Sequence, residues 1–199
     1  QANQAYKNGN YQEAVRLYTE LSTAGFVSGH IYYNLGNSYF RQGDLGRSIL
    51  NYERARSLIP RDADLAFNLG YARDRLRDAV EPPARPLGSI FFWLDAISLN
   101  ELFFFFAIVN AFLFTVLILR LTIRREWIFT LMVTVLVIWL IAGLSLGVKW
   151  YQDTGDRRAV IIAVETKVSA GPDMRDTELF KLHAGTVVLT ERMEDGWVL

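Results

Sequence analysis

The chain has 199 residues, of which 21 are basic and 21 acidic, so its formal net charge is zero. A neutral balance without any basic stripe gives no reason to expect a nucleic-acid partner. The absence of cysteine excludes disulfides, thiolate metal sites and a thiol nucleophile. Because the chain opens inside an amphipathic helical pattern, we expect further residues before Gln1 in the full protein.

A period of 34 residues dominates residues 1–80. Tyr33-Asn34-Leu35-Gly36 recurs as Phe67-Asn68-Leu69-Gly70, and Gly9-Asn10 recurs as Gly43-Asp44. This spacing resembles that of tetratricopeptide repeats (TPRs), in which each unit is a pair of antiparallel helices. The resemblance implies an α-helical TPR solenoid over residues 1–80, with about two and a half units.

The central unit indicates how the helices are expected to pack. Gly36 lets the paired helix approach closely, Gly43 ends the first helix, and Pro60 ends the second. Ser48 stands where such repeats usually carry alanine. A third unit has only its first helix, which we expect to cap the stack. Its charged residues are expected to point outward: Arg73, Asp74, Arg75, Arg77 and Asp78.

Aromatic and polar residues beside the buried face predict a groove lined by the first helices of the units. Aromatic rings with an amide and a cation suit an extended peptide, whose backbone the asparagine side chain could hydrogen-bond. The alternative is that the rings simply pack between adjacent repeats. The candidate partner-binding residues are Tyr6, Lys7, Tyr33, Asn37, Phe40, Arg41, Phe67 and Tyr71.

Residues 81–100 predict a stiff linker and then a helix at the membrane surface. Glu81–Pro86 is rich in proline and separates the repeats from the apolar part of the chain. Ile90–Leu94 is too short to cross a membrane, and Trp93 among apolar neighbours suits the headgroup layer. Ser98 followed by Glu101 matches a capping box, which starts the next helix.

Two uncharged apolar runs come next in the chain, Leu102–Leu119 and Trp127–Val148. A hydrocarbon layer of roughly 30 Å needs about 20 helical residues, so each run is long enough to cross a membrane. We therefore predict transmembrane helices within residues 101–125 and 126–149, joined by a short turn. Such a hairpin places the parts before and after it in the same compartment.

The orientation of the hairpin is predicted from its arginines. The positive-inside bias places an arginine-rich turn in the cytoplasm. In a bacterium, this gives an inner-membrane protein with two spans and with both terminal domains in the periplasm. Basic residues after the second run weaken the bias at that end. The arginines of the turn are Arg120, Arg124 and Arg125.

Polar and small residues inside the two runs are candidates for helix packing in the membrane. Asn110 lies in the middle of the first run, where an unpaired amide is costly, so it is expected to face a partner helix. Gly143 and Gly147 form a small-xxx-small pair that permits close helix contact. A transport site around Asn110 is the sharper alternative, but no ionisable neighbour supports it.

After a linker at residues 150–158, residues 159–199 change to short β-type runs with turn signals. The segment ELFKLHAGTVVLTERMEDGWV resembles bacterial SH3-like domains, which implies a small all-β barrel. Its closing strands are expected past Leu199, so the domain is incomplete within residues 159–199. The resemblance implies that Trp197 anchors the barrel. The alternative is that Trp197 is a platform for a ligand such as a cell-wall peptide.

No catalytic or metal-binding constellation is visible in the sequence. His30 and His183 are the only histidines, and neither has a ligand-type companion three or four residues away. We expect His183 to be exposed. No phosphate-cradling glycine loop or nucleophile elbow occurs. The sequence therefore predicts neither an enzyme nor a cofactor.

The order of TPRs, proline linker, two spans and SH3-like tail resembles that of BatE-like proteins, which are encoded with Bat aerotolerance operons. The segments YYNLGNSYFRQGDLGRSILNYERARSLIPRDADLAFNLGYARD and GPDMRDTELFKLHAGT carry the resemblance. It implies a non-enzymatic scaffold in a membrane complex with von Willebrand factor A proteins and a MoxR-type AAA+ ATPase, linked to envelope stress tolerance. The alternative is a cell-wall binding module that positions a peptidoglycan enzyme.

Overall fold

The computed structural model describes residues 1–78, 91–171, 176–194 and 197–198. The chain divides into two compact units. One unit comprises Gln1–Arg85 together with Arg157–Leu199, and the other comprises Pro86–Asp156. The predicted proline linker at Glu81–Pro86 lies outside the described residues.

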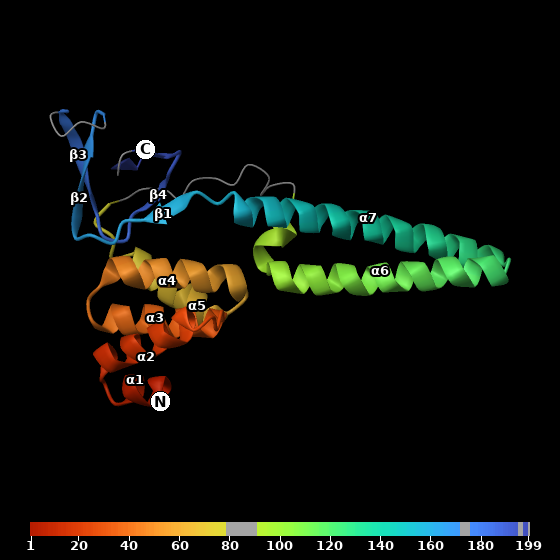
Figure 1. The fold of residues 1–199 in the computed structure, drawn as a ribbon, viewed down its shortest axis with the longest axis horizontal. Helices are drawn as coiled ribbons and strands as arrows, with labels where there is room; N and C mark the ends of the chain where they lie inside the picture. The colour runs from red at the N-terminus through yellow and green to blue at the C-terminus, as the bar shows by residue number, and fades with distance from the viewer. Residues whose placement is uncertain (79–90, 172–175, 195–196, 199) are drawn as a thin grey trace. The chain divides into compact units, whose positions relative to one another are not determined.

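The N-terminal half of the first unit is a stack of antiparallel helices (Figure 1). Each helix contacts the next one along the chain, as the TPR pattern predicts. The predicted repeat is visible in the turns, where Gly9 and Gly43 both have positive φ and are followed by a capping Asn10 and Asp44. The helices are α1 (Ala2–Lys7), α2 (Tyr11–Thr23), α3 (Gly29–Arg41), α4 (Leu45–Leu58) and α5 (Ala63–Arg73).

The contact between α3 and α4 is as close as the sequence predicts. A Cβ atom added to Gly36 would lie 2.5 Å from the ring of Tyr52, so only glycine fits there. Ser48, which replaces the usual alanine, is fully buried and donates its hydroxyl to the Gly36 carbonyl at 2.9 Å. The hydroxyl is therefore satisfied, and its burial carries little penalty.

The strands of the first unit form three separate antiparallel ladders: β1–β4, β2–β3 and β5–β6. No barrel closes among the described strands, so the structure has small β-ladders where the sequence predicts an SH3-like barrel. Gly196, in the predicted turn before Trp197, lies outside the described residues. The strands are β1 (Arg158–Val160), β2 (Glu165–Ser169), β3 (Glu178–His183), β4 (Val187–Leu189), β5 (Met193–Glu194) and β6 (Trp197–Val198).

The β1–β4 ladder packs on the last repeat. Val160 and Val187 contact the apolar cluster of α4 and α5, which includes Ile49 and Ala72. In a longer TPR array, a second helix of the third unit would cover this surface. Here the strands cover it, so the stack is closed by the C-terminal segment and not by α5 alone.

Asp78 holds the loop between β3 and β4. Its carboxylate accepts the backbone N–H of His183 at 2.6 Å and the hydroxyl of Thr186 at 2.7 Å, and it lies 2.8 Å from the His183 Nδ1 atom. The Asp78 side chain is only 15% exposed, so the expectation that it points outward is wrong. The expectation of an exposed His183 is wrong for the same reason.

The second unit is a hairpin of α6 (Leu99–Thr122) and α7 (Glu126–Thr154), preceded by the short 3-10 helix η1 (Phe92–Ala96). The capping box of Ser98 and Glu101 forms at the start of α6, as predicted. Both helices are long and apolar enough to cross a membrane. The helix α7 continues to Thr154, through much of the predicted linker at 150–158.

Two hydrogen bonds hold η1 against α7. The indole of Trp93 donates to the hydroxyl of Ser145 at 3.3 Å, and the ammonium of Lys149 donates to the Leu94 carbonyl at 3.2 Å. Leu94 and Lys149 are both almost fully buried. The predicted surface helix is therefore a five-residue turn that packs on the hairpin.

Candidate partner-binding surface

The candidate groove residues lie on the surface of the first helices, α1, α3 and α5. At its centre, Asn37 accepts hydrogen bonds from the hydroxyl of Tyr52 at 2.7 Å and from the amide of Asn68 at 2.9 Å. The Asn68 amide also donates to the hydroxyl of Tyr33 at 2.9 Å. Burial raises the pKa of Tyr33 and of Tyr52, so both rings stay neutral. These groups bind consecutive repeats to each other.

The end of this surface near α5 is open. Phe67 is 71% exposed and Tyr71 is 45% exposed, and their rings stack at 6.2 Å with an interplanar angle of 10°. The ring centres of Phe40 and Tyr71 are 5.7 Å apart. The guanidinium of Arg75 lies over the Tyr71 ring at 3.5 Å. We name the four residues Phe40, Phe67, Tyr71 and Arg75 the aromatic strip.

Arg75 is not among the residues that the sequence predicts for this surface. The sequence pattern predicts only an outward charge at the end of the stack. Arg75 lies beyond the end of α5, in the turn that follows it, where its Nη1 atom donates to the Tyr71 carbonyl at 2.9 Å. The helical pattern of the sequence therefore gives no signal for its place over the Tyr71 ring.

The other end of the surface is formed around Tyr11. The Tyr6 ring meets the Tyr11 ring edge-on at 5.4 Å, and the guanidinium of Arg41 lies over Tyr11 at 4.8 Å. Lys7 is exposed at the end of α1. The candidate residues therefore fall into three groups. Tyr33 and Asn37 form an interlocked centre, Phe40, Phe67 and Tyr71 belong to the open aromatic strip, and Tyr6, Lys7 and Arg41 form a cationic end.

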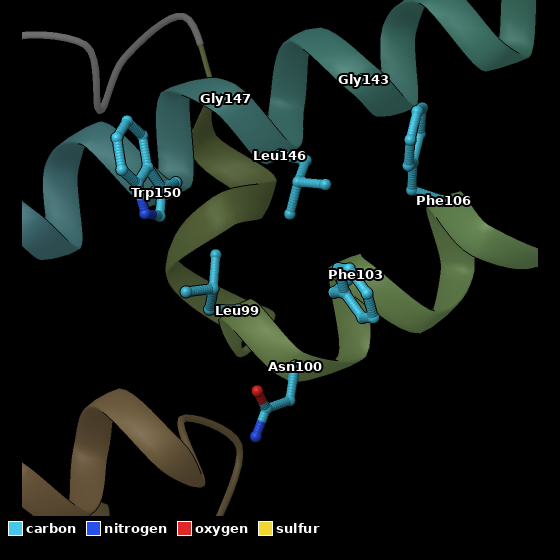
Figure 2. A pocket seen from close by; sticks show the side chains of 8 residues that line it. All are labelled: Leu99, Asn100, Phe103, Phe106, Gly143, Leu146, Gly147 and Trp150. Carbon is cyan, nitrogen blue, oxygen red and sulfur yellow. The ribbon is translucent and has the colours of Figure 1, made fainter.

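The candidate packing residues of the hairpin lie in different surroundings. The Asn110 oxygen accepts the indole N–H of Trp139 on α7 at 3.0 Å. A Cβ atom on Gly143 would lie 3.1 Å from Phe106, whereas one on Gly147 would meet nothing within 4 Å. Both glycines line a groove between α6 and α7 whose volume is about 460 Å³. Figure 2 shows the residues around it. Apolar side chains such as Phe103, Leu146 and Trp150 line this groove.

The described residues contain no cluster of three or more metal-ligating side chains. His30 is exposed on α3, and His183 is bonded to Asp78. The polar groups of the first-helix surface are amides, phenols and cations. They suit recognition of another chain by stacking and hydrogen bonding.

The tetratricopeptide repeat family model matches residues 1–56 and 33–81 of the chain. No curated protein matches the chain significantly. Tetratricopeptide repeats are typical of non-enzymatic modules that bind other proteins. The N-terminal part of the chain, residues 1–81, is therefore a tetratricopeptide-repeat module.

Proposed function

We propose that this protein is a non-enzymatic scaffold, anchored in the bacterial inner membrane by the α6–α7 hairpin, whose repeat module binds partner proteins in the periplasm. The observation that carries the proposal is the aromatic strip. Phe67 and Tyr71 are large rings left exposed on a rigid helix, beside a cation that already stacks on one of them. Rings and arginine of this kind are the anchors that dominate protein interfaces.

The membrane anchor is supported by the exposure of the hairpin. Over their most apolar windows, only 22% of α6 and 17% of α7 is buried. A core helix of a soluble protein is covered by its neighbours, whereas these helices leave an apolar surface that lipid would cover. The arginines of the turn favour a cytoplasmic position for it.

The packing of the first unit supports a common compartment for both flanks of the hairpin. Asp78 precedes the hairpin and bonds His183 and Thr186, which come after it in the chain. Segments that share one core must lie on the same side of the membrane. The shared core supports one compartment for both flanks, and the arginines of the turn support the side on which that compartment lies.

The partners that we propose are membrane proteins of a Bat-type complex, in particular von Willebrand factor A proteins, with a MoxR-type AAA+ ATPase and a role in envelope stress tolerance. The resemblance to BatE-like proteins is the basis for these names. An SH3-like C-terminal module would add a second weak contact. Modules tethered on one face raise each other's effective concentration, so weak contacts can sum to a stable assembly.

The test is affinity purification of the full chain from bacterial membranes in mild detergent, with identification of the bound proteins. We expect membrane partners to co-purify, and to be lost from the double variant Phe67→Ser/Tyr71→Ser. Phe26→Ser is the matched control, because Phe26 is 62% exposed but lies in the loop between α2 and α3. Partner loss from the control alone, or from neither variant, would contradict the proposal. Retention on isolated peptidoglycan that depends on Trp197 would instead favour the cell-wall module.

A further inference from the structure

A second groove is lined by residues of α2, α3 and α4 and shares no lining residue with the aromatic strip. Its floor is apolar and consists of Leu35, Leu50 and the rings of Tyr32 and Tyr39. Leu35 is almost fully buried, and the other three are partly open to solvent. The groove runs between α2 and α4, so neighbouring repeats form its two sides.

Two arginines of α4 form one rim of this groove. The guanidinium of Arg47 lies 5.9 Å from the centre of the Tyr39 ring, and that of Arg54 lies 5.9 Å from the Tyr32 ring. Among the described residues, the groove lining includes no carboxylate. The Nη1 atom of Arg47 donates a hydrogen bond to the Asp44 carboxylate at 2.6 Å, and the other N–H groups of the guanidinium are available to a ligand. Arg54 has no carboxylate partner among the described residues.

The volume of the groove indicates what kind of ligand it can hold. Its volume is about 210 Å³, which is below the roughly 300 Å³ at which pockets for drug-sized molecules begin. A water molecule takes about 30 Å³ of the liquid, so the groove has room for one or two apolar side chains. A peptide can place a side chain of this size between two charged groups, so we infer that the occupant is a peptide.

The spacing of the arginines sets the charge pattern of that peptide. Arg47 and Arg54 are seven residues apart on one helix, which is about 10 Å along the axis. In a polyproline II conformation, residues three apart lie on one side of the chain and about 9 Å apart. We propose that this groove is a binding site for an extended acidic peptide, in which two carboxylates three residues apart pair with Arg47 and Arg54 and an aliphatic side chain between them enters the floor.

The C-terminal segment completes the site. Ile162, in the loop after β1, forms one wall of the groove. This loop lies directly on α4, because a Cβ atom on Gly46 would be 2.8 Å from the Ile161 carbonyl and 2.9 Å from the Ile162 Cα. Formation of the site therefore requires the C-terminal segment to be docked on the repeats.

The experiment measures fluorescence anisotropy of a labelled peptide with blocked ends and a central Glu-Leu-Ala-Glu, added to the full chain in detergent. We expect it to bind at least about tenfold more tightly than the matched Gln-Leu-Ala-Gln peptide, because each lost charge-assisted hydrogen bond weakens binding. Arg54→Gln is expected to weaken the acidic peptide about tenfold and to leave the glutamine peptide unchanged. Ile162→Ser is expected to weaken both peptides, because it removes the apolar wall.

Two controls separate this site from loss of fold and from the first-helix surface. Lys167→Gln removes one exposed positive charge from β2 of the same unit and is expected to keep wild-type affinity. Phe67→Ser/Tyr71→Ser alters only the aromatic strip and is also expected to keep it. Three results would overturn the proposal. The first is equal affinity for the two peptides, the second is no saturable binding, and the third is an affinity for the acidic peptide that Arg54→Gln leaves unchanged. Loss of binding in Phe67→Ser/Tyr71→Ser would place the peptide on the aromatic strip and would also overturn it.

Discussion

Gly36 and Gly70 occupy the same position in consecutive repeats, but their surroundings differ. A Cβ atom on Gly36 would meet the Tyr52 ring, whereas one on Gly70 would meet nothing within 4 Å. The reason is that the second unit has a second helix, which carries Tyr52, and the third unit has none in the described residues. Glycine is thus required for packing at position 36, whereas at position 70 the repeat pattern continues without any packing that requires glycine.

We expect Gly36→Ala to lower the free energy of unfolding by about 1–3 kcal/mol, because the added methyl group overpacks the α3–α4 contact. Gly70→Ala, its control, is expected to be neutral or to stabilise α5 by up to about 1 kcal/mol, since glycine is a poor helix former. The measurement is denaturant unfolding of the full chain in detergent, monitored by circular dichroism. Equal effects of the two substitutions would contradict the packing assigned to Gly36.

The role of Asp78 could not be predicted from the sequence. Its partner His183 is 105 residues away along the chain, and no local pattern connects the two. The hydrogen bonds from the His183 backbone N–H and the Thr186 hydroxyl lower the pKa of Asp78 from 3.8 to about 2. The carboxylate therefore stabilises the docked C-terminal segment only while it is ionised.

This linkage predicts a pH dependence. Because the folded-state pKa lies below the unfolded value of 3.8, the contribution is complete above that pH and disappears as the pH falls through about 2. We expect Asp78→Asn to be less stable than the wild type at neutral pH, by about 1 kcal/mol. The difference in unfolding temperature between the two proteins should shrink from about pH 4 to pH 2. A constant difference across that range would show that the charge of Asp78 has no part in the stability.

At the scale of elements, the sequence predicted what depends on local pattern. The 34-residue period, the turn glycines Gly9 and Gly43, and the capping box of Ser98 are all local signals, and the structure shows each of them in place. The strands were harder to predict. β1 and β4 are three residues each and pair across an intervening hairpin, β2–β3, so no continuous alternation defines the sheet. Their docking on α4 and α5 depends on contacts between distant parts of the chain.

The interlocked centre of the first-helix surface is a second point that residue type alone could not decide. An asparagine at position 37 suits both a peptide ligand and a bond between repeats. In the structure its oxygen accepts from Tyr52 and Asn68, so packing accounts for this group. Exposure separates it from the aromatic strip, and exposure is set by the fold and not by the pattern.

The α6–α7 hairpin has one polar link whose strength can be measured. We expect Asn110→Leu to destabilise the hairpin by about 1 kcal/mol, because it removes the acceptor of the Trp139 indole. Trp139→Phe removes the donor, so the double variant is expected to cost less than the sum of the two single variants. The measurement is a double-mutant cycle on thermal unfolding in detergent. Strict additivity would exclude an energetic coupling between Asn110 and Trp139.

At the scale of the whole molecule, the hairpin is an insertion within one folded unit. Residues 1–78 and 157–198 share the apolar cluster that Val160 and Val187 complete. We expect removal of residues 157–199 to lower the stability of the repeats by about 3 kcal/mol, since burial of two valines is lost. Hydrogen exchange of the α5 amides should become faster in the shortened chain. Unchanged exchange would show that the repeats do not depend on the C-terminal segment.

The most direct test of the proposed topology is the side of the membrane on which each part lies. The chain has no cysteine, so single cysteines can be placed at exposed positions by Gln12→Cys, Arg124→Cys and Thr177→Cys. With a membrane-impermeant maleimide on intact bacterial spheroplasts, we predict labelling at positions 12 and 177, and labelling at position 124 only after permeabilisation. Labelling of only one of positions 12 and 177 in intact spheroplasts would contradict both the hairpin topology and the shared domain.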